Sequence, residues 1–371
     1  MLSERKHLLE NKMNILAFES SCDETSAAVV TRECGKFTIK SNIIASQIET
    51  HRLYGGVVPE IASRAHAEVI SSITYEALNT AGVKLSEINL IAVTANPGLI
   101  GALLVGVNFA KSLAIANKIP LVAVDHIKGH TAATLLSDEP PKPPYIALTV
   151  SGGHTAIYHV TDYTDFKIIG TTRDDAIGEA FDKIGRLIGI PYPAGRGFDE
   201  LSREGFIEAT GDEHNFYKNY KKSAAYKDRE TYLPSPAIQD DSLDFSFSGL
   251  KTAGVNLLHR YEQSGKEIPR ALFAARYTFE AVEAVAKKIA LALDKYPDCD
   301  LVLAGGVAAN SHLRARLNEI TKTAKRRLFM PPISLCGDNA AMIAAAGYYE
   351  FEKGNFANSS LNASALDSIT R

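Results

Sequence analysis

The sequence twice places a short polar turn between two apolar strands, and each occurrence opens one half of the chain. The first turn, Ser20-Ser-Cys-Asp-Glu-Thr25, joins strands predicted at 14–19 and 26–30. The second turn, Ser151-Gly-Gly153, joins strands predicted at 145–150 and 154–160. Hydroxyl groups and unobstructed backbone N–H groups suit the binding of phosphate oxygens, although glycine is also common in turns that bind nothing. The repetition therefore predicts a duplicated α/β fold with a nucleotide bound between its halves.

Apolar periodicity in the rest of the chain alternates between helix and strand, as it does in α/β folds. We expect helices at 62–81, 101–117 and 271–293, and strands at 90–94, 121–125 and 301–304. The helix at 101–117 is apolar on almost every side, which predicts that it is buried. The strand at 301–304 runs into Gly305-Gly-Val-Ala-Ala-Asn310. This turn either leads simply into the next helix or places Asn310 to bind a nucleoside.

Two histidines, His126 and His130, follow the predicted strand at 121–125 at the start of a helical segment. Side chains four residues apart on a helix point the same way, so both imidazoles can bind one cation. Asp338 offers a carboxylate just ahead of another, Ala-rich helix, where the helix dipole favours negative charge. The histidines could instead be ordinary hydrogen-bonding residues. Together with Asp338 they form a candidate site for one divalent transition metal, iron (Fe²⁺) or zinc.

The composition narrows the possible partners and location. The net charge of −3 means that any nucleic acid must be held by a local basic patch. The four cysteines form no CxxC pair, which favours a reducing compartment, and we expect the protein in the cytoplasm. No apolar run approaches the roughly 20 residues that span a membrane, so we expect no membrane partner. The first residues lack the apolar stretch of a signal peptide.

The chain is long enough for two cores, because 46% of its 371 residues are hydrophobic. We expect a first lobe, 13–140 with 330–350, that holds the metal ligands, and a second lobe, 141–329, that holds the nucleotide-binding elements. Residues 1–12 form an N-terminal extension in this division. The segment 351–371 is rich in Asn, Ser and Ala and is expected to be a loosely ordered tail.

An ordered series of motifs runs along nearly the whole chain, from Asn14 to about Tyr349. It comprises Glu19-Ser-Ser-Cys-Asp-Glu-Thr25, the stretches 51–60, 62–66 and 97–106, the two histidines, Val150-Ser-Gly-Gly-His-Thr155, Gly178-Glu-Ala-Phe-Asp-Lys183, Phe245-Ser-Phe-Ser-Gly-Leu-Lys251, Gly305-Gly-Val-x-x-Asn310 and Cys336-Gly-Asp-Asn339. With this series the sequence resembles the tRNA N6-adenosine threonylcarbamoyltransferase family, and its bacterial and organellar branch more than the archaeal one. The resemblance implies a duplicated actin-like, sugar-kinase and Hsp70-type (ASKHA) α/β fold with two lobes around a nucleotide cleft.

The resemblance also implies a reaction. Such an enzyme transfers a threonylcarbamoyl group from threonylcarbamoyl-AMP to N6 of adenosine 37 in tRNAs that read codons beginning with A. The metal on His126, His130 and Asp338 would assist the transfer. Asp23 and Glu24 are the best candidates for accepting the proton of the amine, although Glu24 could simply cap backbone N–H groups. The residues expected to hold the adenylate are Thr149, Val150, Ser151, Gly152, Gly153, Asp182, Gly195, Asp199 and Asn310.

Macromolecular partners are implied as well. The segment 216–229 interleaves aromatic and basic residues, as expected for base stacking with phosphate contacts, although a charge run is often only a solvated surface. Its candidate tRNA-binding residues are Lys218, Lys221, Lys222, Lys227 and Arg229. Bacterial relatives work with a smaller paralogue of the same fold and with a P-loop ATPase. We expect the helix at 62–81 to pack on the paralogue, because Val69 and Tyr75 extend its apolar surface beyond one stripe.

Two residues depart from the family pattern. Asn96 stands where we expect glycine, and we expect the change to be mild because Asn tolerates positive φ better than most residues. Lys128 lies between the two metal-binding histidines and is expected to point into solvent.

Three other classes of function are possible for such a chain. An ASKHA-fold small-molecule kinase or ATPase would explain both hairpins but not the His-His-Asp set, because phosphoryl transfer normally uses magnesium held by carboxylates. A metalloprotease would require the Glu of H-E-x-x-H, which this sequence lacks. A non-catalytic paralogue would have no need of metal ligands. The metal set therefore separates the transferase from its rivals.

Overall fold

The computed structural model describes residues 12–236, 238 and 241–369, and the chain divides into two compact units. Unit 1 comprises Met1–Pro144, Val160–Lys167 and Phe329–Arg371, and unit 2 comprises Tyr145–His159 and Ile168–Leu328. The assignment of Val160–Lys167 to unit 1 differs from the division expected from the sequence. Of the N-terminal extension expected at 1–12, residues 1–11 lie outside the described residues.

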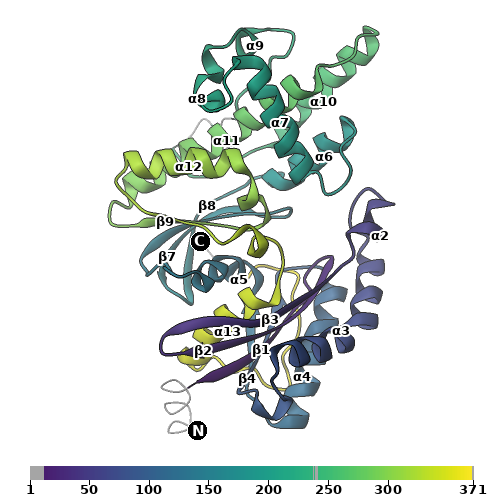
Figure 1. Ribbon diagram of the computed structural model, residues 1–371, viewed down its shortest axis with the longest axis vertical. Coiled ribbons are helices and arrows are strands. Elements are labelled where there is room, and N and C mark those ends of the chain that lie inside the picture. Colours follow the sequence, from purple (N-terminus) through teal and green to yellow (C-terminus); the bar gives the residue numbers. More distant parts are fainter. Residues whose placement is uncertain (1–11, 237, 239–240, 370–371) are drawn as a thin grey trace. The chain divides into compact units, whose positions relative to one another are not determined.

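Unit 1 is built on a five-stranded sheet with the order β3-β2-β1-β4-β5 (Figure 1). Its strands are β1 (Met13–Glu19), β2 (Glu24–Glu33), β3 (Lys36–Ser46), β4 (Leu90–Asn96) and β5 (Leu121–Asp125). β1 pairs antiparallel with β2 and parallel with β4, and β4 pairs parallel with β5. Because parallel strands run in one direction, the carboxyl ends of β1, β4 and β5 meet at the same end of the sheet.

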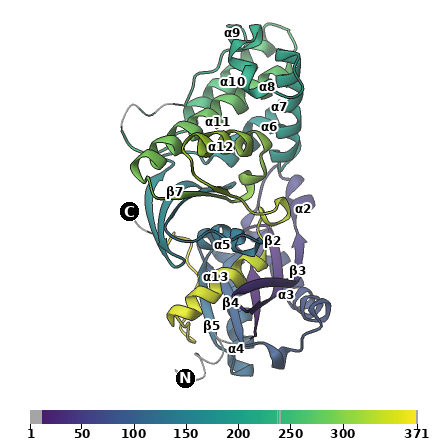
Figure 2. The same ribbon diagram turned by 60° about the vertical axis from the view of Figure 1, so that its left-hand side comes forward.

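Alternating side chains of these strands face two apolar layers. Leu16 and Val93 point into a core that includes helices α3 (Pro59–Ala81) and α4 (Ile100–Asn117). Ile15 and Ala92 point into a second core with α5 (His126–Ala132) and α13 (Ala340–Lys353), which lie on the opposite face of the sheet (Figure 2). Successive strand residues point to opposite faces, so a continuously apolar strand can serve both layers.

Helix α4 has one buried face rather than the all-round burial that its composition predicts. Leu103, Val107 and Ala110 are buried, whereas the side chain of Ile115 is 62% exposed. Among the described residues, α4 is the one helix long and apolar enough to cross a membrane by length and composition. It packs against α3 and the sheet, and is therefore a core helix of unit 1.

The second sheet repeats the strand order of the first. It runs β8-β7-β6-β9-β10, with β6 (Tyr145–Val150), β7 (Thr155–Asp162), β8 (Asp165–Thr171), β9 (Asp300–Ala304) and β10 (Leu328–Phe329). β6 takes the place of β1, with the next strand of the chain, β7, on one side and the parallel strand β9 on the other. This correspondence confirms the predicted duplication of one α/β unit.

Helix α11 (Arg270–Lys295) of unit 2 is buried along most of its length. The other long helices of the unit are α6 (Ile177–Leu187), α7 (Gly195–Thr210), α10 (Ser248–Gln263) and α12 (Ser311–Thr323). α11 packs mainly against α7, which is why a helix of this length carries apolar side chains on more than one face.

The residues after α13 differ from the loosely ordered tail expected at 351–371. The backbone N–H groups of Ala357 and Ser364 donate hydrogen bonds to carbonyl oxygens of β5 and β4, at 2.8 and 2.9 Å. Ala357, Leu361 and Ala363 pack against the core that contains α3 and α4. The scarcity of large apolar residues suggested loose order. Backbone hydrogen bonds and small side chains nevertheless hold this segment in place.

Candidate metal centre and nucleotide-binding elements

Helix α5 presents both predicted histidines on one side. β5 ends at Asp125, whose side chain accepts hydrogen bonds from the N–H groups of Ile127 and Lys128 and so caps α5. His126 and His130 follow one helical turn apart, and both are buried. Their spacing on a helix therefore produces the shared orientation that the sequence predicts.

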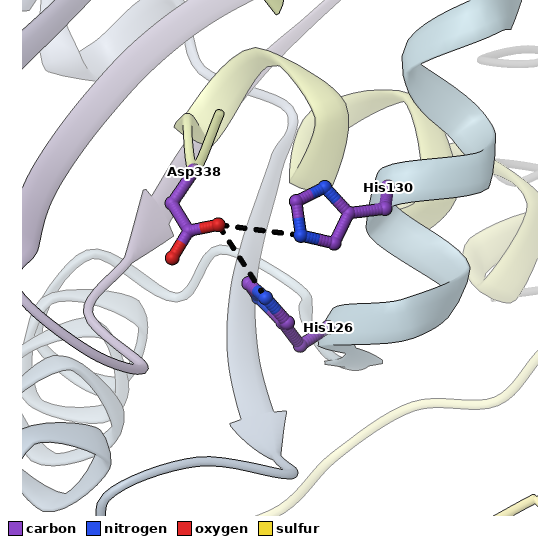
Figure 3. Close-up of side chains that lie close together, drawn as sticks. All are labelled: His126, His130 and Asp338. Atoms are coloured by element: carbon purple, nitrogen blue, oxygen red, sulfur yellow. Dashed lines mark ion pairs between the residues drawn. The ribbon is translucent and has the colours of Figure 1, made fainter. Parts of the chain in front are cut away.

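Asp338 completes the group from the turn before α13. Its Oδ1 lies 3.3 Å from Nε2 of His130 and 3.5 Å from Nε2 of His126 (Figure 3). One ligand atom from each residue lies within 4.8 Å of the others, and no second group of this kind occurs among the described residues. All three residues belong to unit 1. The structure thus brings together the three ligands proposed from the sequence.

The surroundings of His130 fit a bound cation. Its side chain is 1% exposed, and neither ring nitrogen has a hydrogen-bond partner among the described residues. Buried polar atoms without partners are rare and unfavourable. A cation held by Nε2 and by the carboxylate of Asp338 would satisfy this nitrogen. Two imidazoles and one carboxylate suit iron or zinc better than magnesium or calcium, which prefer oxygen ligands.

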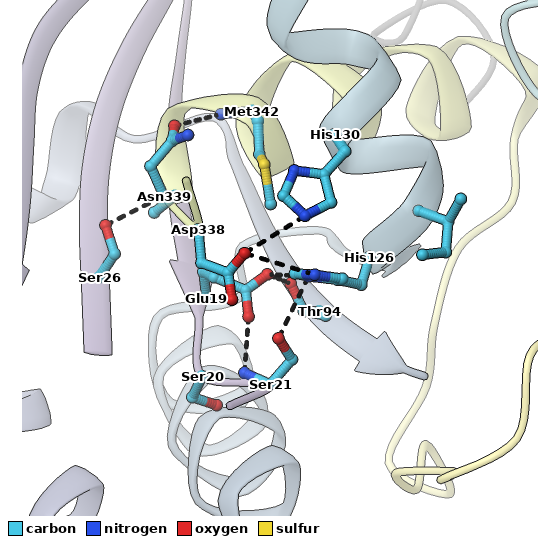
Figure 4. A network of polar contacts seen from close by, with 12 residues as sticks. Glu19, Ser20, Ser21, Ser26, Thr94, His126, His130, Asp338, Asn339 and Met342 are labelled. Carbon is cyan, nitrogen blue, oxygen red and sulfur yellow. Dashed lines mark hydrogen bonds and ion pairs between the residues drawn. The ribbon is translucent and has the colours of Figure 1, made fainter. Parts of the chain in front are cut away.

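Glu19 fixes the orientation of His126 from behind (Figure 4). Nδ1 of His126 donates to Oε2 of Glu19 at 2.9 Å, and Ser21 Oγ lies 3.2 Å from the same nitrogen. Thr94 Oγ1 and the Ser21 backbone N–H donate to the two carboxylate oxygens of Glu19, each at 2.6 Å. With Nδ1 engaged in this way, Nε2 of His126 faces Asp338. Such carboxylate–histidine pairs are typical behind metal ligands.

Glu19 and His126 each shift the pKa of the other. Burial raises the pKa of Glu19, but the charge of His126 and the hydrogen bonds from His126 and Thr94 together hold it below its ordinary value. Burial lowers the pKa of His126, whereas the charges of Glu19 and Asp338 raise it to about 9. Glu19 was not among the site residues proposed from the sequence. The sequence feature that could have identified Glu19 is its position as the one carboxylate in β1, at the end of an otherwise mostly apolar strand.

The predicted proton acceptors lie in the turn between β1 and β2. Asp23 is buried, and Glu24 is half-buried at the start of β2. Burial, the charge of Asp338 and the charge of Asp23 raise the pKa of Glu24 to about 10. His66 holds this turn from α3, since its ring nitrogens lie 2.7 Å from Thr25 Oγ1 and 2.9 Å from the carbonyl oxygen of Cys22. The turn is therefore held in place, and the charge of the metal-ligand candidate Asp338 acts on Glu24 in it.

The turn after β6 has open space above its two glycines. Neither Gly152 nor Gly153 has a positive φ, and a Cβ added to either would meet no atom within 4 Å. Neither backbone strain nor packing therefore requires glycine here. Thr149, at the end of β6, is fully buried with its hydroxyl unpartnered among the described residues, and Ser151 Oγ accepts from the His154 N–H at 3.1 Å.

A second turn of unit 2 lies directly against the end of β6. Gly305 has a φ of 92°, and a Cβ there would overlap the carbonyl oxygen of Val150. Only glycine permits this approach. The carboxyl ends of the parallel strands β6 and β9 thus bring together the two glycine-containing turns proposed from the sequence.

The other predicted nucleotide-binding residues take part in local hydrogen bonds. Asp182 Oδ1 accepts from the N–H of Ala194, the residue before Gly195 at the start of α7. Asp199 Oδ1 accepts from the Ser311 N–H at 3.0 Å. Asn310 caps α12, because its Oδ1 accepts from the N–H of Leu313 at 2.8 Å. Asp182 of α6 and Asp199 of α7 thus bond to the starts of the following helices, α7 and α12.

Known proteins match this chain along most of its length. Residues 38–345 match the family described as tRNA N6-adenosine threonylcarbamoyltransferase. Curated members from Streptococcus pneumoniae (strain D39) and Clostridium botulinum (strain 657) are each 47% identical, over 94% and 96% of this chain and 96% and 97% of the relatives. The chain belongs to this family. A member from Moorella thermoacetica is 46% identical over 96% of this chain and 97% of its own length.

Solved structures support the fold of this transferase family member. HypF from T. kodakarensis aligns with a TM-score of 0.54 and 12% identity, over 97% of this chain and 50% of that protein. Component A of the (R)-2-hydroxyglutaryl-CoA dehydratase of Acidaminococcus fermentans aligns with a TM-score of 0.50 and 13% identity, over 92% of this chain and 98% of that one. At such identities the likeness concerns the fold alone, and it confirms the predicted ASKHA fold.

In the transferase, the basic segment 216–229 forms the short helices α8 (Phe216–Asn219) and α9 (Ala224–Lys227). Its aromatic residues range from buried to half-buried. Tyr220 is 1% exposed and packs with Tyr217 and Tyr226 around Phe279 of α11. These side chains close a small core over α7 and α11, and base stacking stays a prediction for the half-buried Phe216, Tyr217 and Tyr226. The side chains that remain exposed are those of Lys218, Lys221, Lys222, Lys227 and Arg229.

The two departures from the family pattern hold segments near the metal ligands. Lys128 does not point into solvent: its Nζ donates to the Thr164 carbonyl oxygen at 2.8 Å and lies 3.3 Å from the Glu350 carboxylate. That expectation was wrong because Glu350 on α13 attracts the ammonium group into the unit. Asn96 has no positive φ, and instead its amide donates to Asp125 at 2.6 Å.

The transferase purified from its natural host is expected to contain about one iron or zinc ion per chain, as a site with three protein ligands requires. His126→Ala or Asp338→Ala should lose the metal and the activity while the circular dichroism spectrum stays unchanged. His259→Ala removes an exposed histidine from α10 and should keep the metal. Active protein without iron or zinc in elemental analysis would contradict the assignment.

Proposed function

We propose that this chain forms threonylcarbamoyladenosine in tRNA. It transfers the threonylcarbamoyl group of threonylcarbamoyl-AMP to N6 of adenosine 37 in tRNAs that read codons beginning with A. Membership of the family supports the reaction. The observation that carries the proposal is the set of two buried histidines, His126 and His130, with Asp338, because phosphoryl transfer by kinases and ATPases of this fold does not require it.

The metal would be one divalent iron or zinc ion. When bound, such a cation supplies a positive charge that polarises a carbonyl oxygen of the donor. Glu19 keeps Nε2 of His126 directed at the ion, and burial of both histidines keeps water from competing for the site.

In this proposal Asp23 and Glu24 accept the proton that the adenine amine loses. The lone pair of the adenine amine is delocalised into the ring, so N6 becomes nucleophilic only as its proton leaves. The bond from N6 to the carbamoyl carbon forms, the bond from that carbon to the phosphate oxygen of AMP breaks, and the proton moves to the carboxylate pair. A positive ion beside Asp338 offsets one of the charges that raise the pKa of Glu24, which favours a carboxylate able to accept the proton.

Unit 2 would hold the adenylate. The open turn of Ser151, Gly152 and Gly153, with Thr149 and Val150 before it, suits the phosphate side of the donor. Asp182, Gly195 and Asp199 would contact the ribose and base, and Asn310 the adenine. Gly195 and Asn310 lie at the starts of α7 and α12, and Asp182 and Asp199 accept hydrogen bonds from N–H groups at these two starts.

The tRNA and protein partners form the rest of the proposal. Lys218, Lys221, Lys222, Lys227 and Arg229 are exposed and would contact tRNA phosphates, next to the half-buried aromatic residues of the same segment. The smaller paralogue of the same fold and the P-loop ATPase would be protein partners. The cytoplasm would be the place of this work, and the four free cysteines support that location.

Mass analysis of tRNA nucleosides tests the function directly. Depleting this protein in its host should remove threonylcarbamoyladenosine, and resupplying the intact chain should restore it. Resupplying His126→Ala at equal abundance should not, because the metal would be lost. An unchanged nucleoside level after complete depletion would overturn the proposal.

Gly152→Val tests the adenylate site. The added side chain would occupy the open space above the turn, so the dissociation constant of AMP should rise by at least about tenfold, the effect of losing one hydrogen bond to a charged group. Gly152→Ala should have a smaller effect, and both variants should retain their metal because the ligands lie in unit 1. Equal AMP affinity of Gly152→Val and the unaltered protein in calorimetry would leave these glycines without a role in binding.

Tyr75→Glu tests the paralogue interface on α3. Val69 packs against the core of its own unit, so a charge there would disturb folding, whereas Tyr75 is 73% exposed. The Tyr75→Glu chain should no longer co-elute with the smaller paralogue and should retain its metal. Tyr232→Glu, at an exposed tyrosine of unit 2, is the matched control and should still associate. Co-elution of Tyr75→Glu with the paralogue would exclude this interface.

A further inference from the structure

Asp125 is a buried carboxylate whose two oxygens have different partners. Oδ1 accepts hydrogen bonds from the N–H groups of Ile127 at 2.9 Å and Lys128 at 3.4 Å, and so caps the first turn of α5. Oδ2 accepts from Nδ2 of Asn96 and from Oγ of Ser368, each at 2.6 Å. Helix α5 has only seven residues and carries both histidines. The orientation of this one carboxylate therefore determines where the first of them stands.

Ser368 reaches Asp125 from the far end of the chain, 243 residues away in sequence. The segment that brings it there is anchored at several points. The Ala357 N–H donates to the first residue of β5, and the Ser364 N–H donates to β4 one residue before its end. Nζ of Lys111 on α4 donates to the Leu361 carbonyl oxygen at 2.8 Å. The described tail thus follows β5 from its start to the carboxylate at its end.

The path ends with an exposed serine beside a buried apolar residue. Ile369, the residue after Ser368, is 7% exposed, whereas Ser368 itself is exposed. The buried side chain of Ile369 anchors the backbone next to the donating hydroxyl, and the acceptor, Asp125, is buried as well. None of the proposed steps at the donor or the tRNA uses Ser368 or Asp125, so their contact has no other assigned role.

We infer that the C-terminal tail is part of the metal centre: Ser368, by holding Asp125, positions α5 and slows the loss of the ion from its two histidines. Without the hydroxyl, Oδ2 of a buried carboxylate keeps one donor of two, and the carboxylate can turn away from the N–H groups that it caps. The first turn of α5, with His126, then becomes easier to displace. This inference rests on the metal site in the proposed function.

The test measures zinc loss rather than activity. Full-length protein loaded with zinc is mixed with excess chromogenic chelator, and the rate of zinc transfer is recorded. Ser368→Ala should lose zinc on the order of tenfold faster, the lower end of the effect typical of residues behind metal ligands. Ser368→Thr keeps the hydroxyl and should lose zinc at the rate of the unaltered protein. Ser360→Ala removes an exposed tail hydroxyl that donates to the nearby Asn358, and its rate should also be unaltered.

Thermal unfolding of the metal-stripped proteins separates positioning from general stability. The unfolding temperature of Ser368→Ala should fall further below that of Ser360→Ala with zinc than without metal. An unaltered zinc-loss rate in Ser368→Ala, or an equal fall in its unfolding temperature with and without metal, would overturn the role of Ser368 alone. Failure of the unaltered protein to bind zinc or iron would overturn the metal site as well.

Discussion

The buried pair of Glu19 and His126 is the interaction on which the arrangement of unit 1 depends. A carboxylate without solvent is very unfavourable unless it is paired, and Glu19 is paired with an imidazole, a hydroxyl and a backbone N–H at once. These donors come from α5, β4 and the turn after β1. The pair therefore ties three segments together at one point. It also decides which nitrogen of His126 remains for a cation.

Parallel strands explain why such distant residues meet. Glu19 ends β1, Thr94 and Asn96 lie at the end of β4, and Asp125 ends β5, and these three strands run in the same direction side by side. Polar side chains placed at strand ends thus gather at one end of the sheet, which is where open α/β sheets bind their ligands. The second sheet repeats the device, with the turns after β6 and β9 in contact through Gly305.

The duplicated units have diverged in the chemistry of these strand ends. In unit 1 the turn and helix starts carry carboxylates and imidazoles, which suit a cation and the transfer of protons. In unit 2 they carry glycines, hydroxyls and capped helix starts, which suit a phosphate and a nucleoside. Division of the work between a metal-binding and a nucleotide-binding half fits a transfer whose donor is an adenylate. The same fold occurs in HypF and in a dehydratase component, so the side chains rather than the architecture carry the function.

Much of this protein was determined by local sequence. The alternation of strands and helices, the repeated hairpin and the His126–His130 spacing follow from periodicity and turn chemistry, which act over a few residues, and the motif series identified the family. Tertiary structure alone decided the pairing of Glu19 with His126, the inward turn of Lys128, the burial of Tyr220 and the contact of Ser368 with Asp125. Each of these depends on which partner the folded chain brings near, and contacts between residues tens to hundreds of positions apart leave no periodic trace in the sequence.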